Sequence, residues 1–162
     1  MHLLLSALIG GLAFRLRGSD LVHVTPIPME GRLIWSAAMA LLAFWLSAWD
    51  ARLLLLFPAF FIGACPGWFQ TLDLGRDSDR PWWQEALWMA ARGLIWTGPP
   101  AVVMALVGYD WTFGFAGLLC PILYEIAWRT PLRIPHLTQG PELGELLFGL
   151  WLGAALYLSM GA

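Results

Sequence analysis

Charged and amide side chains that interrupt apolar stretches are the residues of this chain best placed to do chemistry. Five of them are candidates for a ligand or gate site: Arg15, Gln70, Arg92, Glu125 and Glu145. An ionisable group inside a membrane span costs about 2.5–3.5 kcal/mol on insertion scales, so each such group needs a partner or a function. We therefore expect Arg92 to face the interior and to pair with Glu145 or Glu125. Glu125 also precedes Arg129 by four residues, the favourable order for an ion pair on one helix face. The alternative to a ligand site is a structural ion pair that only fixes the register of the helices.

The sequence carries none of the common catalytic or metal-binding motifs. Cys65 and Cys120 both lie in apolar stretches, each is followed by proline, and they make neither a CxxC nor a Cys/His metal spacing. The histidines form no HExxH pair, and there is no phosphate-binding loop, no GxGxxG and no serine nucleophile elbow. We predict no catalytic residue, no metal site and no cofactor, and an enzyme is the less favoured class.

The composition indicates the environment of these residues. Of the 162 residues, 59% are hydrophobic and only 12% are charged, whereas soluble domains carry about 25% charged residues. This excludes a nucleic-acid module, a secreted disulfide scaffold and a disordered tail. Six mostly apolar segments, the first of them short, follow one another at 1–16, 33–49, 53–72, 85–107, 110–128 and 143–160. The chain is predicted to be an all-α integral membrane protein with six transmembrane helices in a single domain, residues 1–162.

The loops predict an orientation in the membrane. Two connections are very short, at 50–52 and 108–110, whereas 15–32, 73–84 and 129–142 are long and polar. All 9 basic residues are arginine, and the long-loop side holds Arg15, Arg17, Arg32, Arg76, Arg80, Arg129 and Arg133. The opposite side holds only Arg52. Because cytoplasmic loops carry an excess of basic residues, we predict a multi-pass protein of the inner (cytoplasmic) membrane with both termini on the non-cytoplasmic side.

A weak repeat of about 55 residues runs through the chain. The matched sets are Gly10/Cys65/Cys120, Phe14/Phe69/Tyr124 and Arg15/Gln70/Glu125. We interpret it as three tandem helical hairpins, residues 1–52, 53–107 and 108–162, around a pseudo-three-fold axis, with chance similarity among apolar helices as the alternative. In that arrangement the first, third and fifth helices line the axis, and Arg15, Gln70 and Glu125 share one level of it. Pro66 and Pro121 would each free a backbone carbonyl and bend their helices.

Tryptophan and glycine give two further expectations. Seven of the 11 tryptophans fall near predicted helix ends and are expected in an interfacial belt: Trp35, Trp49, Trp68, Trp82, Trp83, Trp111 and Trp128. In the last segment, Gly149-x-x-x-Gly153 allows a neighbouring helix to approach closely.

Three classes of function fit these features. A small transporter or channel for a small solute or ion, with its path along the axis, is favoured by the repeat, the prolines and the intramembrane charges. A non-enzymatic accessory or phage-type interaction subunit fits the small size and the aromatic content, and a packed axis would favour it. A lipid-modifying membrane enzyme would need a polar cluster at headgroup depth beside a lateral opening. The expected partners are membrane lipids, with a homo-oligomer or a membrane-protein partner left open, and no nucleic acid.

Overall fold

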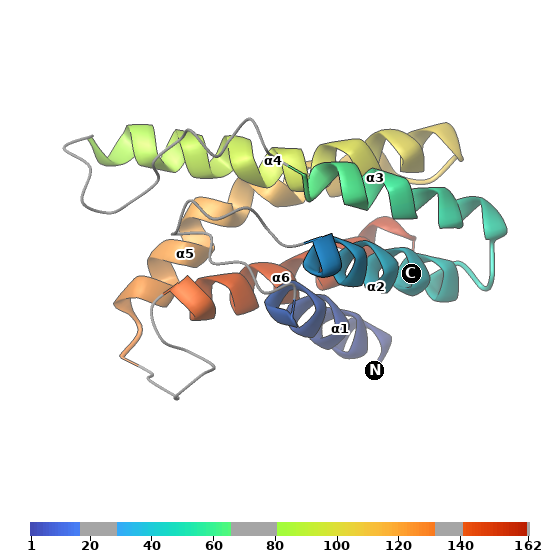
Figure 1. Cartoon of the computed structure of the whole chain (residues 1–162), viewed down its shortest axis with the longest axis horizontal. Helices are drawn as coiled ribbons and strands as arrows, with labels where there is room; N and C mark the ends of the chain where they lie inside the picture. The colour runs from blue at the N-terminus through green and yellow to red at the C-terminus, as the bar shows by residue number, and fades with distance from the viewer. Residues whose placement is uncertain (17–28, 66–80, 132–140, 162) are drawn as a thin grey trace.

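The computed structural model describes residues 1–16, 29–65, 81–131 and 141–161, and within these residues the chain is helical with no β-strand. Its α-helices are α1 (His2–Leu16), α2 (Met29–Leu46), α3 (Leu56–Gly63), α4 (Trp82–Leu106), α5 (Cys120–Arg129) and α6 (Pro141–Ser159) (Figure 1). A 3-10 helix leads into two of them, η1 (Ala51–Leu55) into α3 and η3 (Trp111–Leu119) into α5. The all-α prediction is confirmed for the described part of the chain.

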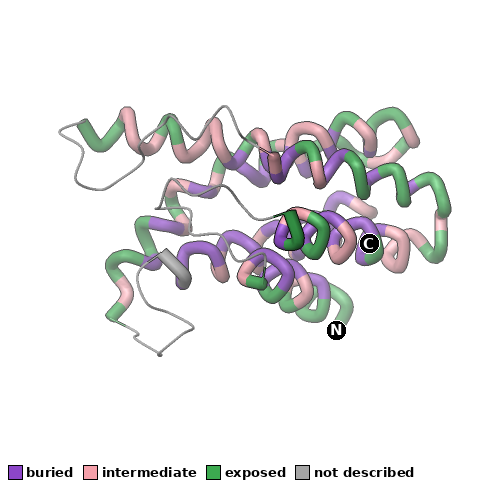
Figure 2. Tube along the Cα trace, viewed as in Figure 1, coloured by how far each residue is buried: buried purple, intermediate pink, exposed green. Residues whose placement is uncertain are grey.

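The helices form a ring in chain order. Each helix packs against the next, and α6 packs back against α1, so the ring is closed and odd helices alternate with even ones. Buried positions face the interior, and exposed positions follow the outer faces (Figure 2). Figure 1 shows α1 beginning and α6 ending toward the end of the ring that holds the turns after α2 and α4.

The two most extensive helix contacts, α1 with α6 and α4 with η3, depend on glycine. A Cβ on Gly153 would collide with the carbonyl of Ser6, and a Cβ on Gly93 would collide with the carbonyl of Gly117. Gly149 also packs against the backbone of α1. Small residues let helix backbones approach closely, so Gly149-x-x-x-Gly153 serves the contact between α6 and α1.

The helices α2 and α4 end in the same type of turn. In each, the backbone N–H three residues after the last helical residue donates to the carbonyl five residues earlier, as in a Schellman motif. These bonds run from Trp49 to Phe44 at 2.9 Å and from Tyr109 to Met104 at 2.8 Å. The residue before each donor is left-handed, Ala48 with φ 54° and Gly108 with φ 88°. These two turns lie about 60 residues apart, whereas the repeat predicted from the sequence is about 55 residues long. The three-fold repeat stays a prediction.

An aspartate follows each turn and caps the next helix. Oδ1 of Asp50 accepts from the backbone N–H of Arg52 at 3.0 Å, and Oδ1 of Asp110 accepts from that of Thr112 at 2.9 Å. Asp50 also pairs with the guanidinium of Arg52 at 2.7 Å, and its Oδ2 accepts from the hydroxyl of Tyr109 at 3.1 Å. The hydrogen bonds from the Arg52 side chain and backbone lower the pKa of Asp50 from 3.8 to about 2. Asp50 therefore links the two turns.

Length and hydropathy support two membrane spans among the described residues. They are Met29–Leu46 and the continuous helical segment Trp111–Arg129. Three further apolar helices, His2–Leu16, Ala51–Gly63 and Leu143–Ser159, are shorter. The longest helix, α4, has 25 residues but carries several tryptophans and two prolines, which lower its hydropathy. The six-span prediction is therefore supported only in part.

Two prolines lie inside α4. Because proline has no N–H, Pro99 and Pro100 leave the carbonyls of Ile95 and Trp96 without their helical donors. The backbone of α3 covers these carbonyls, since a Cβ on Gly63 would lie 2.9 Å from the Ile95 oxygen and 3.0 Å from the Trp96 oxygen. A glycine is therefore needed where α3 crosses the interrupted part of α4.

Of the two prolines predicted to kink the odd helices, only Pro121 lies among the described residues. Pro121 lies in the first turn of α5, where the 3-10 helix η3 changes to α-helix. The bend predicted at Pro121 stays a prediction. Pro66 lies outside the described residues, so its role stays a prediction.

Candidate functional site

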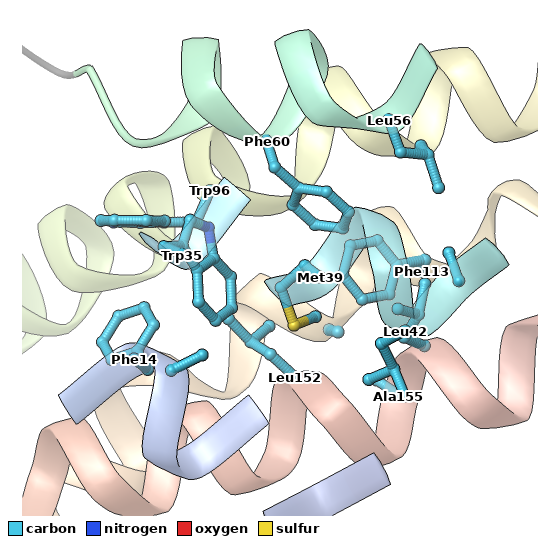
Figure 3. Close-up of a cluster of buried hydrophobic side chains, with 14 of the residues drawn as sticks. Phe14, Trp35, Met39, Leu42, Leu56, Phe60, Trp96, Phe113, Leu152 and Ala155 are labelled. Carbon is cyan, nitrogen blue, oxygen red and sulfur yellow. The ribbon is translucent and has the colours of Figure 1, made fainter. Parts of the chain in front are cut away.

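Aromatic side chains fill the centre of the ring. They are Phe14 of α1, Trp35 of α2, Phe60 of α3, Trp96 of α4, Phe113 of η3 and Phe148 of α6, and none is more than 1% exposed. Figure 3 shows most of them converging between the helices, with Met39 and Leu152 beside them. Nearly every helical segment thus contributes one ring to a shared core, which we call the aromatic core.

The rings of the aromatic core touch one another in an unbroken series. Phe14 lies 5.3 Å from Phe148 and 5.0 Å from each of Trp35 and Trp96, measured between ring centroids. Trp35 lies 5.9 Å from Phe60, which lies 5.9 Å from Phe113. Most of these pairs are edge-to-face, a favoured geometry for aromatic rings. Between the described parts of the helices, the axis is therefore packed with side chains.

One tryptophan expected at the membrane interface is part of this core. Trp49, Trp82, Trp83, Trp111 and Trp128 are exposed, as an interfacial belt requires. Trp35 is 0% exposed, so its predicted place in the belt is wrong. The physical reason is that α2 begins at Met29 and not at residue 33, which moves Trp35 nearly two turns into the helix. Trp68 lies outside the described residues.

Ionisable residues lie one helical turn from the aromatic core on the even helices. Arg32 precedes Trp35 by three residues, Arg92 precedes Trp96 by four, and Glu145 precedes Phe148 by three. The helices α2, α4 and α6 run in the same direction through the ring (Figure 1), so each ionisable residue precedes the core aromatic residue of its own helix by about one turn. We call this group the charged layer. Sequence reasoning found Arg92 and Glu145 but placed Arg32 in a loop, although its spacing from Trp35 puts it on the buried face of α2.

Arg92 is surrounded by groups from two other helices. Its guanidinium interacts electrostatically with the hydroxyl of Tyr124, then with the thiol of Cys120, and least with the carboxylate of Glu145. Glu145 is 1% exposed, Tyr124 2% and Cys120 3%. Of the two carboxylates predicted as partners, the buried Glu145 acts electrostatically on Arg92, whereas the exposed Glu125 pairs with Arg129; a direct ion pair of Arg92 with Glu145 stays a prediction. A buried arrangement of this kind fixes how α4, α5 and α6 sit against one another.

The second arginine of the charged layer contacts the other cysteine. Nη1 of Arg32 donates to Sγ of Cys65 at 3.3 Å, which joins α2 to the end of α3. Both cysteines are free thiols, and each lies beside an arginine of an even helix. A thiol is a weak acceptor, so these contacts position the guanidiniums more than they neutralise them.

The structure describes two of the three residues predicted to share one level of the axis, Arg15 and Glu125. Arg15 is half-buried near the end of α1, directly after Phe14. Glu125 is half-exposed, and its Oε1 accepts from Nε of Arg129 at 2.6 Å, which confirms the expected ion pair. Gln70 lies outside the described residues. The meeting of Arg15, Gln70 and Glu125 on one axis therefore stays a prediction.

Glu125 and Arg129 border a groove on the outside of the ring. The groove lies between the first half of α4 and α5 and has a volume of about 580 Å³. Glu85 of α4 adds a second carboxylate to it. Sequence reasoning missed this groove, because it depends on which faces of α4 and α5 turn outward together.

Among the described residues, no three His, Cys, Asp or Glu side chains come together as metal ligands. No protein-family model, curated protein or solved structure matches the chain.

Proposed function

We propose that the chain is a multi-pass membrane protein with six spans, in which both termini and the two short turns lie on the non-cytoplasmic side. Its charged fraction of 12% is about half that of soluble domains. The outer face of α1 carries a leucine every four residues, namely Leu4, Leu8, Leu12 and Leu16, each at least 46% exposed. Contiguous apolar surface of this kind marks a face that contacts lipid or protein.

The short helices are compatible with this proposal. At 1.5 Å per residue, the 15 residues of α1 extend about 22 Å, whereas the hydrocarbon core of a bilayer is about 30 Å thick. Arg15 lies at the predicted cytoplasmic end of α1, where a long side chain extends to the interface. Local thinning of the bilayer accommodates the remaining mismatch at a modest cost.

Within the membrane, the role that the geometry supports best is that of a non-enzymatic interaction subunit. The observation that carries this proposal is the aromatic core, which occupies the space where a path for a solute would run. A transporter needs an axis that opens to water, whereas an interaction subunit needs a stable bundle that presents its outer faces. The outer faces here are apolar and include a groove.

A transporter remains a second candidate because of the charged layer. Buried ionisable residues in membrane proteins often mark ion or substrate pathways. Arg92 and Glu145 are residues of this kind. A transporter with this structure would have to separate the aromatic core to let a solute pass.

A test that needs no knowledge of the solute distinguishes the two candidates. Ala43 lies on α2 in the core and is 0% exposed, so Ala43→Cys reports on the axis. In a variant without Cys65 and Cys120, reconstituted into liposomes, a membrane-impermeant maleimide should leave Ala43→Cys unlabelled. Ala51→Cys, at an exposed position next to the turn after α2, is the positive control. Labelling of Ala43→Cys would show that the axis opens to water and would favour the transporter.

A further inference from the structure

The groove between α4 and α5 combines an apolar floor with a charged rim. On α4 it is lined by Trp82, Glu85 and Met89, and on α5 by Ile122, Glu125 and Arg129 among others. Glu125 and Arg129 are already joined by an ion pair, so the charged rim has a defined geometry. The groove is open to the outside of the ring, where the proposed membrane would lie.

The polarity of the groove changes along its length in the way a lipid leaflet does. Arg129 is the last residue of α5, and Trp82 is the first of α4, so both lie at the predicted cytoplasmic end. Ile122 lies seven residues before Arg129, which corresponds to about 10 Å along the helix. One leaflet of hydrocarbon is about 15 Å deep. The rim therefore falls at headgroup depth, and the apolar floor falls beside the upper part of an acyl chain.

The charges of the rim select one kind of headgroup. The rim holds two carboxylates, Glu85 and Glu125, and one guanidinium, Arg129. A guanidinium has five N–H donors, so Arg129 can bond a phosphate while its Nε holds Glu125. The second carboxylate leaves an excess of negative charge that complements an ammonium group.

We propose that this groove binds phosphatidylethanolamine of the cytoplasmic leaflet, with the phosphate on Arg129 and the ammonium at Glu85 and Glu125. The proposal rests on the membrane-spanning function proposed above. A phosphatidylcholine headgroup carries the same charges, but its quaternary ammonium has no N–H and cannot donate hydrogen bonds to the carboxylates. A phosphatidylglycerol headgroup has no ammonium, and its negative charge is repelled by the excess carboxylate.

The proposal is tested by titrating the purified full chain in detergent with three phospholipids that have identical acyl chains. Native mass spectrometry reports the apparent Kd for phosphatidylethanolamine, phosphatidylcholine and phosphatidylglycerol. We expect phosphatidylethanolamine to bind about tenfold more tightly than the other two, which corresponds to about 1.4 kcal/mol. Equal binding of phosphatidylethanolamine and phosphatidylcholine by the parent chain would overturn the proposal.

Variants locate the preference in the groove. Glu125→Gln should reduce the tenfold preference to about twofold or less, because the amide cannot pair with an ammonium as a charged group. Arg129→Gln should weaken the binding of all three phospholipids, because it removes the guanidinium that holds the phosphate. The matched control is Arg52→Gln, which removes an exposed ion pair at the opposite end of the ring and should leave the preference unchanged. A preference that persists in Glu125→Gln, or that is lost in Arg52→Gln, would place the lipid elsewhere.

A further variant tests the groove without changing any charge. Ala86 lines the groove, so Ala86→Phe should fill it and remove phosphatidylethanolamine binding without changing any charge. Unchanged binding in Ala86→Phe would also overturn the proposal. A chain that stays dispersed in aqueous buffer without detergent and retains no phospholipid would refute membrane insertion itself. A chain that inserts but binds all three lipids equally would refute the groove alone.

Discussion

The predicted pairing of Arg92 with the buried Glu145 gives the sharpest test of the interior. We predict that Arg92→Leu is strongly destabilising, because it leaves the carboxylate of Glu145, 1% exposed, without its cation. Removing one partner of a buried ion pair costs about 3–5 kcal/mol. Arg92 itself is only half-buried, so its guanidinium can reach toward the interface when Glu145 is changed. Glu145→Gln should therefore cost less, about 1–3 kcal/mol, close to the cost of one unsatisfied buried polar group.

The double variant distinguishes a contact from two independent effects. Adding Glu145→Gln to Arg92→Leu replaces a stranded charge with a neutral amide, so the double variant should be more stable than Arg92→Leu alone. Residues in contact show coupling energies of about 0.5–3 kcal/mol in such cycles. The measurement is the free energy of unfolding in detergent micelles, followed by near-ultraviolet circular dichroism as the denaturing detergent is raised.

The exposed pair of Glu125 and Arg129 is the matched control for this cycle. Both side chains are at least 50% exposed, and their ion pair joins residues four apart on one helix. Breaking it should cost about 0.5 kcal/mol or less. A contact between Arg92 and Glu145 is refuted if Arg92→Leu is no more destabilising than Glu125→Gln, or if the effects of Arg92→Leu and Glu145→Gln simply add.

Three further predictions concern the rest of the bundle. Gly93→Ala should separate α4 from η3 and lower the midpoint of thermal unfolding by several degrees. The control is Gly98→Ala, whose added Cβ would meet no atom within 4 Å, so the unfolding midpoint should stay the same or rise. Cysteines introduced at Glu30 and Asp110 should react with impermeant maleimide from opposite faces of the membrane, and labelling from one face would contradict the six-span topology. Because the pKa of Asp50 is lowered to about 2, its stabilising contribution should be complete above about pH 4 and be lost as the pH falls from about 4 to 2. Asp50→Asn should remove that part of the acid sensitivity, and an unchanged acid profile would argue against a role for this carboxylate.

The sequence was sufficient to predict helices but not the place where each begins. Apolar stretches reveal membrane-compatible helices directly, and they predicted most of the helical segments with boundaries shifted by a few residues. The exception is the predicted segment 53–72, because α3 already ends at Gly63. The start of α2 was missed because Glu30, Gly31 and Arg32 read as loop. In the structure they form the first turn, where a carboxylate complements the exposed N–H groups of the helix end. That shift of one turn is the reason Trp35 was assigned to the interface.

The charged part of the site was partly predictable, whereas the aromatic part was not. The cost of an ionisable group in a span drew attention to Arg92 and Glu145, a local property of each segment. The aromatic core depends on contacts between residues far apart in the chain, such as Phe14 with Phe148 and Phe60 with Phe113. Nothing in the spacing of these residues along the sequence marks them as neighbours. Only the closure of the ring brings them together.

The distribution of charge and apolar surface connects the fold to its proposed environment. Arg92 and Glu145 lie inside the ring, whereas leucines such as Leu4 and Leu12 lie outside. In water, this arrangement would bury charge and expose apolar surface, and both cost free energy. In a bilayer the outer leucines are solvated by acyl chains, so the hydrophobic effect no longer drives the helices together. The close glycine contacts and the packed aromatic rings then hold the helices together, and the two most extensive helix contacts, α1 with α6 and α4 with η3, are glycine contacts.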